Sequence, residues 1–167
     1  LNNGSIDANI FQHRPYLDAQ IQAHGYHIKA LAKTFVFPFG FYSKKIHSLK
    51  DIPQHALIAL PNDPSNEGRA LLLLAKAHLI SLPAAAGLFA RPKDIVKNRL
   101  HLRFIELDAA QIPRALSNVV LGGLTNDYAK PAGFKPRDAL ILESANSLYA
   151  NVIAVRSDIK NKKPYQQ

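Results

Sequence analysis

Asn66 and Arg69 are spaced so that together they could bind a small anion. They lie three residues apart in the segment PNDPSNEGR, just before a strongly apolar stretch that predicts a helix from Leu71 to Ala77. Residues three apart share one face of a helix. A helix N-terminus favours an anion, and the arginine guanidinium adds two parallel donors for a carboxylate. The same pattern is also typical of an Asn near a helix cap beside an exposed Arg.

Two further features could take part in small-molecule capture. Phe11, His13 and Tyr16 follow a short apolar segment and precede a predicted helix, so they could line an apolar pocket with polar tips. Core aromatics beside a surface histidine would give the same pattern. Asn151 is an amide inside the otherwise apolar run YANVIAV. A buried amide needs partners, and either a ligand or the backbone could supply them.

The motifs of the common enzyme classes are absent from the sequence. It contains no GxSxG elbow, no phosphate-binding P-loop, no GxGxxG and no HExxH. His24 and His27 flank a glycine and lack a nearby acidic residue, which favours a surface turn over a metal site. Glu106 and Asp108 follow a predicted strand, where helix or turn capping is expected rather than acid–base catalysis. We therefore expect a protein that is not an enzyme, with no cofactor and no metal.

Strand-like and helix-like segments alternate along the chain and must position these residues. Extended patterns cover residues 6–11, 27–31, 34–41, 56–60, 100–107, 119–124, 138–142 and 151–156. Helical spacing of Tyr16, Leu17 and Ile21, with a stop at Gly25, predicts the first helix. Such alternation indicates an α/β protein with largely parallel sheets, whose ligands sit beyond the carboxyl ends of strands. The turns after Leu60 and Leu124 are therefore expected near a site.

Composition leaves one alternative function open. The 167 residues carry a net charge of +9, which suits nucleic acid, anionic membrane or an acidic partner. The basic residues are scattered, however, and are densest at Arg156, Lys160, Lys162 and Lys163, where a solvated terminus is expected. No RNA-binding signature accompanies them. The alternative is a basic surface interaction module, adhesin-like or nucleic-acid-binding, without amino-acid capture.

Several segments of the sequence together resemble the NlpA-type methionine-binding lipoproteins. They are IDANIFQHRPYLDAQI, TFVFP, YSKKIHSLKDI and ALPNDPSNEGRALLLLAKAHLI, followed by LRFIELDAAQIPRAL, LTNDYA and YANVIAVR. Their order and spacing cover nearly the whole chain, and PNDPSNEGR and FQHRPYLD are specific. The resemblance implies a periplasmic-binding-protein type II fold of two lobes with two crossovers. Lobe one would comprise residues 1–42 and 126–167, and lobe two residues 43–125, with crossovers near 37–42 and 125.

The resemblance also implies a function and a location. Such proteins bind L- or D-methionine, or a close analogue, by lobe closure and deliver it to an ABC permease with a separate ATPase. They are periplasmic or lipid-anchored at the cell envelope, and no nucleic acid is expected as a partner. The chain has no Met and begins at Leu1, so we expect the signal, the lipidated Cys and the N-terminal part of lobe one to be missing. We further expect the shortened chain to associate with itself or with that missing piece.

The family's ligand contacts can be carried over to numbered positions. The side-chain pocket falls on Phe11, His13 and Tyr16, the carboxylate clamp on Arg69 with Asn66, and the strand amide on Asn151. One position departs from the family pattern. Many members have an Asn three residues before the Tyr of an NxxYA-like turn, where this chain has Thr125 followed by Asn126. Either Asn126 shifts into the site or Thr125 makes a shorter contact.

Overall fold

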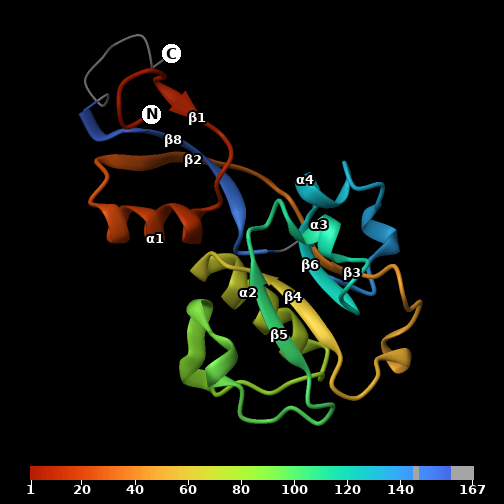
Figure 1. The fold of residues 1–167 in the computed structure, drawn as a ribbon. Helices are drawn as coiled ribbons and strands as arrows, with labels where there is room; N and C mark the ends of the chain where they lie inside the picture. The colour runs from red at the N-terminus through yellow and green to blue at the C-terminus, as the bar shows by residue number, and fades with distance from the viewer. Residues whose placement is uncertain (145–146, 159–167) are drawn as a thin grey trace. The chain divides into compact units, whose positions relative to one another are not determined.

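The computed structural model describes residues 1–144 and 147–158 and divides into two compact units (Figure 1). Unit 1 contains residues 1–36 and the described part of the segment from residue 146 onward, and unit 2 contains residues 37–145. Lys160, Lys162 and Lys163 lie outside the described residues. Within the described ranges, no helix combines the length and the apolar character that crossing a membrane requires.

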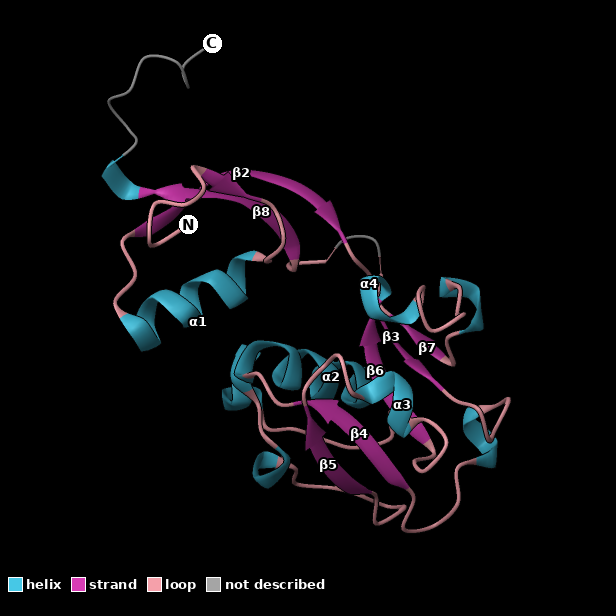
Figure 2. Ribbon diagram, turned by 45° about the horizontal axis from the view of Figure 1, so that its top comes forward, coloured by secondary structure: helices cyan, strands magenta, loops and turns pink. Residues whose placement is uncertain are grey.

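Unit 1 is a three-stranded antiparallel sheet with one helix against it (Figure 2). The strand order is β1-β8-β2, and Leu17 of the helix packs with Val152 and Ala154 of the central strand. The elements are β1 (Ala8–Asn9), α1 (Arg14–His24), β2 (Ile28–Val36) and β8 (Ala150–Arg156).

Helix α1 confirms the prediction from apolar spacing. It begins after His13, whose ring nitrogen accepts a hydrogen bond from the backbone N–H of Tyr16. It ends at Gly25, which adopts a left-handed conformation with φ of 66° and donates to the Ile21 carbonyl. A glycine tolerates this conformation without the steric penalty of a side chain, so the predicted stop is the observed C-cap.

Unit 2 is a five-stranded mixed sheet with strand order β5-β4-β6-β3-β7. β4 pairs in parallel with β5 and β6, whereas β3 pairs antiparallel with β6 and β7. The elements are β3 (Phe39–Tyr42), β4 (Leu57–Pro61), α2 (Pro64–Lys76), β5 (Arg103–Leu107), α3 (Ile112–Ala115), β6 (Leu121–Thr125), α4 (Asn126–Ala129) and β7 (Ile141–Leu142), with short 3-10 helices at Leu49–Asp51, Ala84–Phe89, Pro92–Asp94 and Pro136–Asp138.

Successive side chains of the central strand β4 pack on opposite faces of the sheet. Ile58 and Leu60 join the core that contains Leu71 of α2, while Ala59 joins the core that contains Ile112 of α3. Alternation of this kind is expected of a strand whose two faces are both covered. Because both faces are buried, the polar groups at the strand ends are the ones left available for ligand chemistry.

One expectation about the architecture needs correction. The sheets are not largely parallel: among the described residues, only β4–β5 and β4–β6 are parallel pairs, and the strands of unit 1 pair antiparallel. Parallel neighbours need a crossover, and the α2 and α3 connections provide crossovers only within unit 2. The lobe boundaries stay a prediction. In the structure, residues 37–42 and 126–144 lie in unit 2, since β3 pairs with β6 and β7, and α4 packs against β6.

Candidate functional site

Arg69 lies in the second turn of α2, and the start of this helix fixes its position. The Asp63 carboxylate caps the helix by accepting from the backbone N–H of Asn66 at 3.0 Å. The Asn66 amide donates to the other Asp63 oxygen at 3.0 Å, which orients that side chain. Because α2 directly follows β4, both Asn66 and Arg69 lie just beyond the carboxyl end of a parallel strand. This is the edge where α/β sheets bind ligands.

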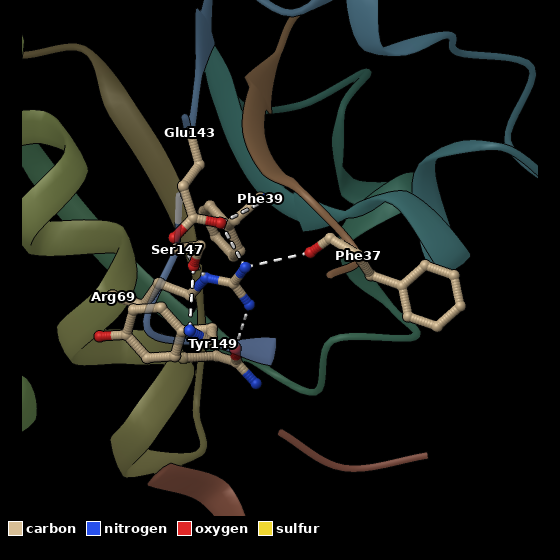
Figure 3. Close-up of polar contacts among 7 residues, drawn as sticks. Phe37, Phe39, Arg69, Glu143, Ser147 and Tyr149 are labelled. Atoms are coloured by element: carbon tan, nitrogen blue, oxygen red, sulfur yellow. Dashed lines mark hydrogen bonds and ion pairs between the residues drawn. The ribbon is translucent and has the colours of Figure 1, made fainter. Parts of the chain in front are cut away.

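The Arg69 guanidinium is held by a dense set of polar contacts (Figure 3). Its Nε donates to one Glu143 oxygen at 3.1 Å, and its Nη2 donates to the other oxygen. Nη2 also donates to the Phe37 carbonyl at 3.0 Å, and Nη1 makes a long contact of 3.5 Å with Asn66 Oδ1. The guanidinium carbon lies 5.5 Å from the centroid of the Phe39 ring. The guanidinium therefore has a defined orientation on unit 2.

Glu143 is a component of the site that the sequence interpretation missed. Its side chain is 14% exposed and that of Arg69 is 2% exposed, so the two form a largely buried ion pair. Glu143 is itself fixed to β3, because its carboxylate accepts from the Phe39 N–H at 3.3 Å and its own N–H donates to the Phe39 carbonyl at 2.8 Å. Its position directly after the apolar run at residues 139–142 was a usable signal, since the other polar site residues also follow strands.

Thr125 and Asn126 lie at the carboxyl end of β6, in the same unit as Arg69. Thr125 is in register with Phe39, and the backbone N–H of Asn126 donates to the Pro38 carbonyl at 3.0 Å. The side-chain oxygen of Asn126 is buried and has no hydrogen-bond partner within the described ranges of the chain. A buried acceptor of this kind calls for a donor, which a bound ligand could supply.

Unit 1 brings His13 and Asn151 together across its sheet. The two residues form an antiparallel bridge, and both are buried. The Asn151 amide donates to the Phe11 carbonyl at 3.3 Å. His13 Nδ1 accepts from the Tyr16 N–H at 3.1 Å, so this hydrogen-bond assignment leaves the proton of a neutral imidazole on Nε2. Phe11, His13 and Tyr16, which were predicted as one group, thus lie close to Asn151, which was predicted separately.

Aromatic rings surround His13, and one of them was not expected from the sequence. Phe11 and Tyr16 meet edge to face at 6.1 Å, and His13 meets Tyr149 in the same way at 5.1 Å. Tyr149 is buried, whereas Phe11 is 63% exposed and therefore not a core residue. The Tyr149 signal was its position two residues before Asn151, on the same side of the strand pattern. Together these rings could enclose an apolar ligand group.

A second acidic group lies at the start of α2. Glu67 is buried, and burial followed by the charge of Glu106 raises its pKa from 4.5 to about 7, although Arg91 acts in the opposite direction. These residues line an open cavity of about 420 Å³. Glu106 was expected to cap a turn, but that role belongs to Asp108, which accepts from the Ala110 N–H at 2.9 Å. Glu106 is instead the electrostatic neighbour of Glu67.

Comparison with known proteins gives consistent matches in sequence. The family model described as NlpA lipoprotein matches residues 1–167. Lipoprotein 28 of Escherichia coli is 45% identical over 163 residues, covering 96% of this chain and 60% of that protein. The D-methionine-binding lipoprotein MetQ of Salmonella typhimurium is 44% identical over 164 residues, with coverage of 96% and 60%. The chain therefore spans about 60% of the length of these relatives.

Solved structures give the same result for the fold. An ABC transporter periplasmic substrate-binding protein from Coxiella burnetii superimposes with a TM-score of 0.93 at 55% identity, over 97% of this chain and 68% of that one. A nutrient-binding protein from Burkholderia cenocepacia, solved bound to methionine, gives a TM-score of 0.93 at 50% identity, over 97% and 69%.

Proposed function

The chain belongs to the NlpA lipoprotein family, and from this premise we propose that it captures methionine or a close analogue for an ABC importer. Its α/β fold is that of periplasmic substrate-binding proteins of type II. The names of two relatives support methionine as the ligand, and the name of the Coxiella burnetii protein supports an ABC importer. In this proposal the protein works outside the inner membrane, freely periplasmic or lipid-anchored, and hands methionine to a permease that has its own ATPase.

The observation that carries the proposal is the buried guanidinium of Arg69 at the start of α2. It is oriented by its partners, lies beyond a parallel strand and adjoins Asn66. This arrangement is expected of a group that binds a small carboxylate. Asn126 adds an acceptor whose buried oxygen needs a donor, which the α-ammonium of an amino acid provides. On this basis Arg69 binds the ligand carboxylate, Asn66 assists, and Asn126 rather than Thr125 contacts the ammonium.

The groups of unit 1 suit the rest of an apolar amino acid. In the proposal Asn151 contacts the polar backbone of the ligand through its amide. Phe11, His13 and Tyr16 contact its side chain. A thioether is polarisable and packs favourably against aromatic rings, which supports methionine over an aliphatic amino acid of similar size. The edge-to-face contacts of the Tyr16 ring with Phe11 and with His13 are the observation behind this assignment.

Mass spectrometry of the purified chain tests the function without assuming a ligand. The protein is washed, denatured and filtered, and the filtrate is analysed for small molecules. We expect methionine in an amount that approaches one per chain. A filtrate without any amino acid, combined with nucleic-acid binding that weakens steeply with salt, would instead support the basic interaction module.

A further inference from the structure

Glu143 is a permanent part of the Arg69 site rather than a placeholder for a ligand carboxylate. Its two oxygens accept from Arg69 Nε, Arg69 Nη2 and the Phe39 N–H. Its backbone N–H also pairs with Phe39, a fully buried residue of β3. If the carboxylate swung away, the Phe39 N–H would lose its acceptor in a buried place, which is unfavourable. Ligand binding is therefore expected to leave the Arg69–Glu143 pair in place.

This permanence has an electrostatic consequence for the ligand. The charges of Arg69 and Glu143 sum to zero, and both side chains are largely withdrawn from water. A ligand that brings only a carboxylate would add one uncompensated negative charge to a site of low dielectric, which is costly. A ligand that brings a carboxylate and an ammonium adds no net charge. The orphan oxygen of Asn126 favours such a donor as well.

We propose that Glu143 is a specificity-determining residue: by neutralising Arg69, it restricts the site to zwitterionic α-amino acids and excludes the corresponding hydroxy acids. This inference rests on the proposed function, because it takes Arg69 as the group that reads the ligand carboxylate. Glu143 selects for the ligand ammonium although its own bound partner is the arginine. Without Glu143, the arginine would be a full positive charge and would accept a simple carboxylate.

The test compares two ligands that differ only in the charged group next to the carboxylate. L-Methionine has an ammonium there, and 2-hydroxy-4-(methylthio)butanoate has a hydroxyl. The unaltered chain should bind methionine tighter by about 100-fold or more. In Glu143→Gln this ratio should fall by at least about 10-fold, with binding of the hydroxy acid unchanged or improved. Glu143→Asp keeps the charge and should keep the preference. Glu106→Gln is the matched control, which should leave the ratio unaltered.

Each outcome bears on the proposal. Equal weakening of both ligands in Glu143→Gln would mean that Glu143 only supports the local structure, and it would overturn the proposal. Similar affinities of the unaltered chain for the two ligands would overturn it without any variant, so the test survives a variant that fails to fold. An unaltered chain that binds methionine without discrimination refutes the Glu143 assignment alone. One that binds neither ligand refutes the proposed function and the Glu143 assignment together.

Discussion

Replacing Arg69 with methionine separates the structural role of the arginine from its binding role. The substitution keeps an unbranched side chain but removes the donors to Glu143 and to the Phe37 carbonyl. Glu143 would keep its 3.3 Å contact with the Phe39 N–H but lose the guanidinium that balances its charge. Removing one partner of a buried ion pair lowers the free energy of unfolding by about 3–5 kcal/mol, and the 14% exposure of the Glu143 side chain favours the lower end of that range. Loss of the carboxylate contact should cost about 2–5 kcal/mol of affinity, or about 30- to 5,000-fold.

The double variant Arg69→Met with Glu143→Gln shows whether these two losses are independent. Removing both charges leaves neither partner of this pair as an unpaired buried ion, so most of the lost free energy of unfolding, measured by urea unfolding, should return. Methionine affinity, measured by calorimetric titration, should not return, because no guanidinium is present. A double variant that binds methionine as tightly as the unaltered chain would refute the assignment of Arg69 to the ligand carboxylate.

Three further predictions concern unit 2. Gly68→Ala should lower the free energy of unfolding by about 1–3 kcal/mol in thermal melts, although alanine usually stabilises a helix, because its Cβ would lie 2.1 Å from the Leu88 carbonyl oxygen. Glu67→Gln should remove a pH dependence of the free energy of unfolding. Because the folded pKa of Glu67 is about 7 instead of 4.5, its carboxyl stabilises the fold most below pH 4.5, and up to about 3 kcal/mol of that stability is lost as the pH rises to about 7. Urea unfolding at several pH values would detect the difference between the two proteins. Asn126→Ala should weaken methionine binding by about 1–3 kcal/mol while Thr125→Ala hardly matters, and the reverse result would assign the contact to Thr125.

Local signals in the sequence were sufficient for the first helix and its end. The apolar spacing of α1 and its stop at Gly25 are properties of neighbouring residues, and the structure reproduces them. Helix α2 begins earlier than the apolar run suggested, because Asp63 caps it and Pro64 occupies its first turn.

Contacts between distant residues were beyond the sequence. Strand direction depends on which strands become neighbours. The antiparallel pairing of β3 with β6, and of β8 with β2, could therefore not be predicted from hydrophobic patterns. Arg69 and Glu143 are 74 positions apart, and nothing in either local segment ranks one acidic residue above another as the partner. The individual site residues could be predicted from their positions after strands. The ion pair that orients Arg69 could be identified only from the three-dimensional structure.

A crystal structure of the chain, from crystals grown with L-methionine, tests the central claim most directly. The account predicts that the ligand carboxylate lies within about 2.7–2.9 Å of a guanidinium nitrogen of Arg69, the usual length of a charge-assisted hydrogen bond. It also predicts that Glu143 remains paired with the same arginine. A methionine whose carboxylate is bound elsewhere, with Arg69 contacting only protein groups, would contradict the account.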